Sequence, residues 1–438
     1  MTNRIMISDL SQHIGKTVTI AGWFHKRRLM GGINFLVVRD RTGLVQIVDD
    51  TGEEAAKLDG LYAGTVVELE GEVRADERAM GGVELHAPKL TVKTPVATVP
   101  AIEFDKPIDH RPENLDTLFE HRVLALRNPT EAMIFTLQDR IDRLMREYFQ
   151  EKSCTQIHTP KILAEATEGG AEVFTFDYFD ATATLAQSPQ FYKQMMVGTF
   201  ERVYEIGPVY RAEPSTTTRH MSEYISVDAE LGFLNDFSEL LTFIGGLLHH
   251  VVARLWEQNA AELAKLQAKP VKLADTIPAM TLEELHEAYF KATKEDLRHE
   301  KDPTPAEERF ASEYALKKWG SEAVFITEFP ASEMKFYHLK KADNPLVCDR
   351  ADLIFRGVEI ATISMRENRY DVLVEQMKAA GLDPASPGYK YYLDAFRAGL
   401  PLHGGFGLGL ERLTAKIIGL NNVKEATLFP RDMQRLAP

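Results

Sequence analysis

The most informative segment of the sequence is Val203–Phe233, which reads VYEIGPVYRAEPSTTTRHMSEYISVDAELGF. A first strand ends at Arg211 and Glu213, a small polar loop follows, and a second strand passes through Asp228. Such a hairpin gathers arginines and acids around one pocket. Guanidinium groups bind phosphate oxygens in pairs, and carboxylates bind amines and metal ions. The segment therefore indicates a phosphate site, with a solvated, charged surface hairpin as the alternative.

A glycine-rich segment near the C-terminal end, His403–Leu413, reads HGGFGLGLERL. Glycine lets a backbone approach a ligand closely, and Arg412 enters on the helix that is predicted to follow. Glycine-rich turns between a strand and a helix are common, so this segment alone does not define a site.

A long helix is predicted before these two segments. Asn128 is placed as its N-cap and Pro129 as its first helical residue, and apolar residues then recur at helical spacing as far as Tyr148. Neither a GxGxxG nor a GxxxxGK[ST] motif occurs, so if the protein uses ATP, it binds it on neither a Rossmann nor a P-loop frame. Residues 262–320 are more charged, with Thr281–Glu284 as a capping box, and we expect a peripheral helical insertion without site chemistry.

The first hundred residues predict a small β-barrel. Its five strands are Thr17–Phe24, Ile33–Val38, Leu44–Val48, Thr65–Val73 and Val83–Val92. They are rich in β-branched residues and separated by turns, and Pro88 confines the last one to an edge or a bulge. This pattern favours an OB-fold, a common platform for single-stranded nucleic acid, with a purely structural barrel as the alternative. A proline-spaced linker, 101–127, separates it from the remainder, 128–438.

The composition excludes several classes of protein. With 438 residues, 44% of them hydrophobic, the chain can bury a large core in two or three domains. No apolar run approaches the roughly 20 residues of a membrane span, and the first residues lack a signal-peptide core. Two cysteines without a CxxC predict a cytoplasmic protein that has neither disulfides nor zinc. The net charge of −14 does not exclude RNA, because a local patch such as Lys26-Arg27-Arg28 can bind it.

Together these segments resemble the signature motifs of the class II aminoacyl-tRNA synthetases. The RAE at Arg211 is similar to motif 2, GFGLGLERL to motif 3, and IHTPKI at Ile157–Ile162 to motif 1. The resemblance covers essentially the whole chain and narrows to the aspartate, asparagine and lysine subgroup, most of all to aspartyl enzymes of the archaeal-like branch. It implies an α+β protein in which an OB-fold anticodon-binding domain at 1–100 precedes a catalytic domain at 128–438. The catalytic domain is expected to hold a six-stranded antiparallel sheet flanked by helices, and to form a homodimer through motif 1.

The resemblance also implies a site for ATP and Mg²⁺. The ATP-binding residues that it implies are Arg211, Glu213, Arg219, His220, Tyr224, Glu359 and Arg412. Of these, Arg211, Glu359 and Arg412 would be catalytic: Arg211 binds the α-phosphate and Arg412 the γ-phosphate side. Arg219 and His220 would complete the phosphate clamp, Tyr224 would stack on adenine, and Glu359 with Thr362 would coordinate the metal. Fixed cations suit the charge that builds on the phosphorus oxygens, and the substrate carboxylate is itself the nucleophile.

The amino acid that the resemblance implies is L-aspartate. The residues expected to bind it are Glu168, Gln190, Lys193, Asp228 and Arg366. Lys193, in LAQSPQFYK, would be held by Asp228, and Arg366 would pair with the substrate side chain. Glu168, on the loop TEGG, would take the ammonium group. A buried carboxylate needs paired cations, which argues for aspartate over asparagine.

The N-terminal domain resembles the anticodon-binding module of these enzymes. The residues expected to bind the anticodon are His25, Arg28, Phe35, Gln46 and Glu84. Phe35 would stack on the middle base, which Gln46 would hydrogen-bond, while Arg28 would serve the first base or its backbone. Glu84 would accept from a cytosine at the third base. His25 stands where strictly aspartate-specific relatives tend to carry tryptophan, so tRNA(Asn) is left open as a second acceptor beside tRNA(Asp). Barrel core is the alternative for Phe35.

The sequence departs from the family's pattern at one place, and three alternative functions are considered. Ile363 and Ser364 stand where the family usually has two small residues, often Gly-Gly, so crowding at Ile363 would shift Arg366 and suit a divergent paralog. The rivals are an asparaginyl-tRNA synthetase, a catalytically idle tRNA-binding protein on the same scaffold, and a tRNA-independent asparagine synthetase. Lys193 with Asp228 argues against the first, the three catalytic residues against the second, and the OB-like domain against the third.

Overall fold

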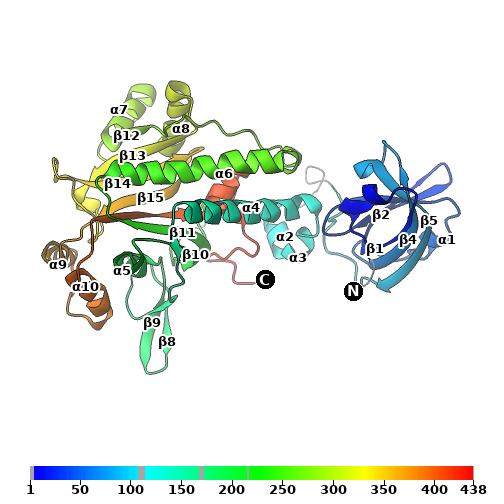
Figure 1. The fold of residues 1–438 in the computed structure, drawn as a ribbon, viewed down its shortest axis with the longest axis horizontal. Helices are drawn as coiled ribbons and strands as arrows, with labels where there is room; N and C mark the ends of the chain where they lie inside the picture. The colour runs from blue at the N-terminus through cyan, green and yellow to red at the C-terminus, as the bar shows by residue number, and fades with distance from the viewer. Residues whose placement is uncertain (1–3, 107–113, 167–171, 215–216, 438) are drawn as a thin grey trace. The chain divides into compact units, whose positions relative to one another are not determined.

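The computed structural model describes residues 4–106, 114–166, 172–214 and 217–437 (Figure 1). The chain divides into two compact units, Met1–Ala132 and Met133–Pro438, and each is described by itself. Glu168 and the rest of its loop lie outside the described residues. Within them, no helix combines the length and the apolar character that a bilayer crossing needs.

The first unit contains a closed five-stranded barrel. Its strands are β1 (Thr17–Met30), β2 (Ile33–Arg39), β3 (Leu44–Asp49), β4 (Val66–Ala75) and β5 (Val83–Thr94), in the order β1-β2-β3-β5-β4. Only the β3–β5 pairing in this barrel is parallel. Its short helices are η1 (Ile7–His13), α1 (Glu53–Ala56), η2 (Met80–Gly82), α2 (Leu115–Glu120) and α3 (Arg122–Ala125). The predicted OB-fold is confirmed.

Side chains of β4 alternate between the barrel core and its surface. Val67 and Leu69 are buried in the barrel, whereas Glu70 is exposed. The pairing of β4 with β5 slips between Glu70 and Glu72, opposite Ala87 and Pro88, and Ala87 adopts a positive φ of 46°. Pro88 therefore lies at a bulge, where its missing N–H costs no ladder hydrogen bond.

The second unit is built on an eight-stranded mixed sheet. Its order is β12-β13-β14-β15-β16-β11-β10-β6. The strands are β6 (Thr155–Gln156), β10 (Arg202–Tyr210), β11 (Glu223–Gly232), β12 (Ala279–Thr281), β13 (Ala323–Pro330), β14 (Val347–Phe355), β15 (Val358–Arg366) and β16 (His403–Gly409). The six central strands are antiparallel, as expected, but β12 and β6 add a parallel neighbour at each edge. Edge strands of two or three residues are too short to show a periodic pattern, so the sequence did not predict them.

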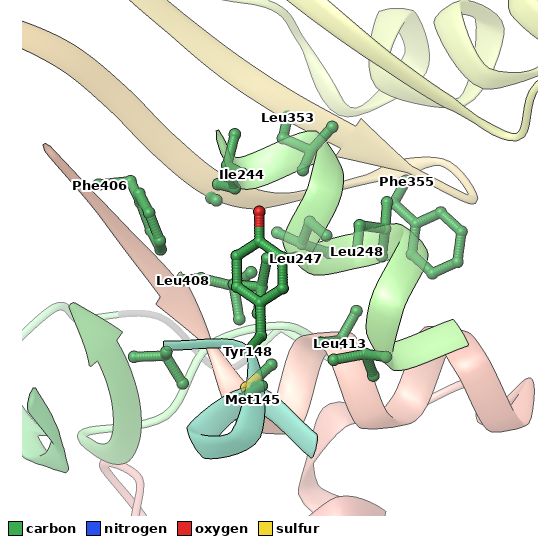
Figure 2. Packing of buried hydrophobic residues seen from close by; sticks show 14 of the residues in the cluster. Met145, Tyr148, Ile244, Leu247, Leu248, Leu353, Phe355, Phe406, Leu408 and Leu413 are labelled. Carbon is green, nitrogen blue, oxygen red and sulfur yellow. The ribbon is translucent and has the colours of Figure 1, made fainter. Parts of the chain in front are cut away.

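Helices cover one face of this sheet and form the main core. They include α4 (Pro129–Glu151), α6 (Phe237–Lys265) and α11 (Leu410–Ile418). Figure 2 shows Tyr148 of α4 among Ile244 and Leu247 of α6, with Phe406 and Leu408 of β16 beside them. The hydroxyl of Tyr148 donates to the carbonyl of Phe243 at 2.8 Å, so the two long helices are joined by a buried hydrogen bond.

The predicted start of α4 is confirmed. The side chain of Asn128 accepts a hydrogen bond from the N–H of Thr130 at 2.9 Å, and Pro129 is the first helical residue. An N-cap oxygen of this kind satisfies an N–H that has no partner within the helix.

The remaining elements stand around the sheet. They are β7 (Ile162–Leu163), β8 (Thr175–Tyr178), β9 (Ala181–Leu185), α5 (Gln190–Phe200), α7 (Leu282–Thr293), α8 (Pro305–Trp319), η4 (Ala331–Glu333), α9 (Tyr370–Ala379), η5 (Pro387–Tyr389), α10 (Lys390–Arg397) and η6 (Val423–Ala426). The capping box of Thr281 and Glu284 begins α7, as predicted. Ala311 and Ala315 of α8 pack against Val324, Ile326 and Ile354 of β13 and β14. The 262–320 segment therefore forms a second hydrophobic core with these two strands.

Candidate active site

A pocket of about 570 Å³ lies on the face of the sheet opposite the main core. It brings together every residue predicted for ATP, metal and aspartate except Glu168, which lies outside the described residues. Those lining it are Gln190, Lys193, Arg211, Glu213, Arg219, His220, Tyr224, Asp228, Glu359, Thr362, Arg366 and Arg412. The alternative of a solvated surface hairpin at Val203–Phe233 is therefore wrong.

Strand alternation places these side chains. In β11, Val227 and Ala229 are in the core, whereas Asp228 lines the pocket. In β15, Ile363 is in the core, whereas Arg366 lines the pocket. Because the period of a strand is two, one run of sequence supplies both a wall of the site and a layer of the core.

The inner end of the pocket is centred on Lys193. Its ammonium donates to Asp228 Oδ1 at 2.8 Å and to the carbonyl of Phe406 at 2.9 Å, and it lies 3.6 Å from Glu230 Oε2. The lysine is 2% exposed, so the alternative of an ordinary surface lysine is wrong. A third N–H remains on the ammonium group after these two donors are used.

Arg366 is the second cation of the inner end. Its Nε donates to Glu230 Oε1 at 2.8 Å, and one terminal nitrogen donates to Ser364 Oγ. Burial alone would raise the pKa of Glu230, but Arg366 and Lys193 outweigh it and hold that pKa below its ordinary value. Glu230 therefore stays ionised between the two cations.

The departure at Ile363 and Ser364 does not crowd the pocket. Ile363 is fully buried in the core on the helix-covered face. Ser364 is on the other face, where its hydroxyl accepts from Arg366. The expectation that bulk at Ile363 would shift Arg366 is therefore wrong, because the alternation of β15 turns this side chain away from the site.

A hydrogen-bond chain lies behind the cations. His403 Nδ1 is 2.8 Å from the carbonyl of Pro401, which assigns the proton to Nδ1, so Nε2 can accept from Gln194 at 3.1 Å. Gln194 Oε1 accepts in turn from Gln190 at 2.9 Å and from the Tyr392 hydroxyl at 3.1 Å. Burial lowers the pKa of His403, although Glu230 opposes this shift, so the ring is neutral as the chain requires.

The residues that are predicted to form a phosphate clamp lie at the outer end of the pocket. Arg211 lies 3.4 Å from Glu213 Oε1 and 5.7 Å from the ring centre of Tyr224. His220 Nε2 lies 3.7 Å from Glu213 Oε2. Burial and the neighbouring arginines Arg412, Arg219 and Arg211 lower the pKa of His220, and Glu213 opposes them. The histidine is therefore neutral near pH 7 in the ligand-free pocket.

Arg412 and Glu359 meet beside this clamp. Arg412 Nη1 donates to the carbonyl of Glu359 at 2.9 Å and lies 3.5 Å from its carboxylate. Its Nη2 reaches the carbonyl of Arg219 at 3.4 Å. Motif 3 and the loop of motif 2 are thus joined through one arginine.

A metal position is suggested by Glu359, Thr362 and Asp352. Thr362 donates to Glu359 Oε1 at 2.7 Å, and Asp352 is paired with Thr362 across β14 and β15. Asp352 Oδ1 is buried and has no hydrogen-bond partner among the described residues. Burial raises the pKa of Asp352 to about 7, and Arg350 opposes the shift. The described residues hold no cluster of three or more acids, histidines or cysteines that could bind a metal ion. Mg²⁺ is usually bound by one or two carboxylates plus substrate phosphates, and the carboxylates of Glu359 and Asp352 fit that pattern.

The glycines of β16 make room for protein side chains. A Cβ at Gly405 would lie 2.0 Å from Glu230 Oε2, and one at Gly407 would lie 3.4 Å from Asp228 Oδ1. The sequence predicted that these glycines let a ligand approach the backbone closely. That expectation is incomplete, because a side chain at position 405 would collide with the carboxylate of Glu230.

The predicted anticodon residues lie on the barrel of the first unit. Phe35 is half-buried and pairs with Arg28 across β1 and β2, and it is absent from the barrel core, which holds its neighbours Leu36 and Val38. The core alternative for Phe35 is therefore wrong. Gln46 pairs with Glu84 across β3 and β5. Its amide donates to Glu84 Oε2 at 3.1 Å, and His86 Nε2 lies 2.6 Å from Glu84 Oε1.

His25 is the least exposed of the five residues, and Glu84, at 8%, is the next. His25 is 4% exposed at the irregularity of β1 between Phe24 and Lys26. Burial lowers its pKa, while the nearby Asp105 opposes that shift. The buried ring offers little surface to an RNA base in this structure, and the role of His25 in anticodon binding stays a prediction.

Two residues that support the pocket, Asp352 and Glu308, were not singled out from the sequence. Asp352 follows the alternation of β14, between Ala351 and Leu353 of the core, so strand periodicity could have found it. Glu308, which pairs with Arg219, comes from α8, where no local pattern marks it. The 262–320 segment therefore supplies a contact to the site, contrary to the expectation of no site chemistry.

An OB-fold barrel, and a catalytic unit with arginines and carboxylates on a central antiparallel sheet, together define a class II aminoacyl-tRNA synthetase. The family model described as tRNA synthetases class II (D, K and N) matches residues 114–433, and the model of the OB-fold nucleic acid binding domain matches residues 18–93. The chain belongs to this family of class II synthetases.

Relatives resemble the chain over nearly its whole length. The aspartate–tRNA(Asp) ligase of Pyrococcus abyssi is 39% identical, with 98% of each chain covered. The aspartate–tRNA(Asp/Asn) ligase of Methanopyrus kandleri is 40% identical, covering 97% of this chain and 96% of that one. Among solved structures, asparaginyl-tRNA synthetase from Pyrococcus horikoshii with asparaginyl-adenylate is 30% identical, with a TM-score of 0.92 and full coverage of both chains.

Proposed function

We propose that the protein activates L-aspartate with ATP and Mg²⁺ and transfers it to tRNA(Asp). The observation that carries the choice of amino acid is the pair of buried cations at the inner end of the pocket, Lys193 and Arg366. Both present N–H donors, so a carboxylate oxygen finds partners there. The NH₂ of an asparagine amide would face the same donors, and the nearby acceptors, Asp228 and Glu230, are already bound to the two cations.

The reaction that we propose has two steps. The α-carboxylate of aspartate attacks the α-phosphorus of ATP, forming aspartyl-adenylate and releasing pyrophosphate. A ribose hydroxyl at the 3′ end of the tRNA then attacks the acyl carbon, and AMP leaves. Arg211 and Arg412 would stabilise the charge that develops on the phosphate oxygens. Glu213, Arg219, His220 and Tyr224 would hold and orient the nucleotide.

Mg²⁺ would be held by Glu359 and Thr362, as the sequence predicts, with Asp352 added by the geometry. Bound there, the ion would neutralise charge on the phosphate oxygens. Gln190 and Asp228 would shape the amino-acid end with the two cations, and Glu168 stays a prediction for the ammonium group.

The tRNA range is proposed from the barrel. Phe35 would stack on an unstacked base, with Arg28 and Gln46 beside it, and Glu84 would favour cytosine at the third position. Relatives named for tRNA(Asp) alone and relatives named for both tRNA(Asp) and tRNA(Asn) are about equally similar to the chain. The percentage of sequence identity therefore does not decide between one tRNA and two. We propose loading of tRNA(Asn) as a weaker second activity.

Two further proposals complete the assignment. A homodimer through motif 1 would cover β6, which forms the outer edge of the sheet in the described residues. Light scattering after gel filtration tests the homodimer.

A cytoplasmic location is supported by Cys154 and Cys348, both buried as free thiols.

ATP–pyrophosphate exchange with aspartate, asparagine and lysine tests the main proposal. Exchange that depends on aspartate supports it, and preferential exchange with asparagine would establish the asparaginyl rival, to which the structure of the Pyrococcus horikoshii enzyme gives weight. The absence of exchange with any of the three would favour the catalytically idle protein.

A further inference from the structure

Glu308 links the 262–320 segment to the triphosphate end of the pocket. Its two carboxylate oxygens accept from Arg219 Nη1 at 2.7 and 2.9 Å. Glu308 Oε2 also accepts from the backbone N–H of Glu359 at 3.0 Å. The glutamate is 5% exposed, whereas the side chain of Arg219 is 28% exposed, so a buried carboxylate holds an arginine that still reaches the pocket.

Helix capping does not explain this glutamate. Acidic residues in the first turn of a helix are common because they complement its dipole. In α8 that role is filled by Glu307, whose side chain accepts from the N–H of Thr304 at 3.0 Å in a capping box. Glu308, one residue later, is directed at another part of the chain.

A second side chain of α8 holds the helix against the turn between β14 and β15, close to the contacts of Glu308. Ser312 lies one turn further along α8 and accepts from the N–H of Gly357 at 2.8 Å. Residues four apart share one face of a helix. The two side chains therefore bind alternate N–H groups, of Gly357 and Glu359, at the turn that joins β14 to β15.

A closed circuit of interactions results. Glu308 joins the side chain of Arg219 to the N–H of Glu359, and Arg412 joins the carbonyl of Glu359 to the carbonyl of Arg219. Only one terminal nitrogen of Arg219 is bound by Glu308. The other donors of the guanidinium make no hydrogen bond within the described residues and can receive an anion from the pocket.

We propose that Glu308 is a positioning residue for ATP: it holds the guanidinium of Arg219 at the triphosphate end before the nucleotide arrives. This inference rests on the proposed function, in which Arg219 binds phosphate. Holding a flexible arginine in place removes part of the ordering cost of binding, so the effect is expected on the affinity for ATP rather than on that for aspartate.

Direct ATP binding in the presence of Mg²⁺, measured by calorimetry without amino acid, tests the proposal. E308Q keeps the size and an acceptor for the N–H of Glu359 but removes the charge, and it is expected to weaken ATP binding about tenfold. In a cycle with R219Q, the double variant should bind ATP no more weakly than R219Q alone. The KM for aspartate in the exchange reaction should stay within twofold of wild type.

Two control variants separate positioning from structure. E313Q removes an exposed charge from the same helix and should bind ATP like wild type. S312A removes the neighbouring anchor of α8 and keeps the Glu308 carboxylate, so it should weaken ATP binding less than E308Q does. E308D keeps the charge, is the variant to use if E308Q fails to fold, and should fall between wild type and E308Q.

Three outcomes would overturn the proposal: ATP binding by E308Q within twofold of wild type, tighter ATP binding, or independent multiplicative effects of E308Q and R219Q. Binding is measured without amino acid, so it separates this proposal from the choice of substrate. A wild-type protein that binds ATP but does not catalyse exchange with aspartate would refute the proposed function. The ATP affinities of the variants would still decide whether Glu308 positions Arg219.

Discussion

Lys193 and Asp228 form a buried ion pair at 2.8 Å, with both side chains about 2–3% exposed. Removing one partner of such a pair leaves an uncompensated buried charge, at a cost of roughly 3–5 kcal/mol. The pair therefore ties the stability of the sheet to the recognition of the substrate.

Lys193→Leu is expected to abolish most aspartate activation and to lower the melting temperature. The double variant Lys193→Leu/Asp228→Asn should recover stability, because no charge is left unpaired, without recovering aspartate activation. Exchange kinetics and thermal melts are measured together. An aspartate kcat/KM within a few-fold of wild type for Lys193→Leu would remove the main support for the aspartyl assignment.

Arg211→Ala and Arg412→Ala are each expected to reduce adenylate formation by 100-fold or more. Each removes a cation that is proposed to face the triphosphate, with an expected effect of about 3 kcal/mol in the transition state. Pyrophosphate exchange is the measurement, and Lys317→Ala, an exposed change on α8, is the control. Near-normal exchange by both arginine variants, with the fold intact, would contradict the motif assignment.

Ser364→Ala should raise the KM for aspartate about tenfold and leave the KM for ATP unchanged. The hydroxyl accepts from Arg366, and hydrogen bonds to charged groups contribute roughly 1.5–3 kcal/mol. Ser364→Thr keeps the acceptor and is expected to stay near wild type. Equal effects on both substrates would mean that the change disturbs the strand and not the arginine alone.

The buried pair of His286 and Glu307 predicts a pH dependence of stability. His286 Nδ1 lies 2.6 Å from Glu307 Oε1 and Nε2 lies 3.1 Å from the carbonyl of Glu300, so both nitrogens face acceptors and must donate. Burial opposes the charge, but Glu307 and the Glu300 carbonyl outweigh it and raise the pKa of His286 above 6.5. Its contribution is therefore complete below pH 6.5 and is lost as the pH rises through the folded-state pKa.

Thermal melts between pH 5.5 and 9 test this sign. The wild-type melting temperature should fall across the alkaline half of that range by about 1–3 °C more than that of His286→Gln, since a change of 1 kcal/mol shifts a domain of this size by a few degrees. Parallel curves for the two proteins would show that folding does not raise the pKa of His286.

Glu84→Gln is expected to weaken the preference for cytosine over uracil at the third anticodon base. A good base-edge contact is worth about 1–3 kcal/mol, or roughly 5- to 150-fold in the ratio of kcat/KM for tRNA(Asp) and tRNA(Asn) transcripts. Glu70→Gln, exposed on β4, is the control. Wild-type protein should load tRNA(Asn) measurably, and His25→Trp should sharpen the preference; a wild type that ignores tRNA(Asn) would contradict a relaxed specificity.

The parts of this molecule that follow a period were predictable from sequence. The strands of the barrel, the cap of α4 at Asn128 and the core–site alternation through Asp228 each depend on residues a few positions apart. Contacts between distant segments were not predictable in this way. Glu308 meets Arg219 across 89 positions of sequence, and the space beside Gly405 is filled by Glu230 from another strand. Only the three-dimensional pairing of β11 with β16 and of α8 with β15 brings these residues together.

The alternation of β15 has a consequence for how this gene can change length. Ser364 and Arg366 face the pocket while Ile363 and Met365 lie in the core. Inserting or deleting one residue within the strand would exchange the two sets, placing a guanidinium in the apolar layer and a methionine beside the substrate. Point substitutions can accumulate there, but single-codon insertions and deletions cannot, so length variation among functional descendants should be confined to the connecting loops.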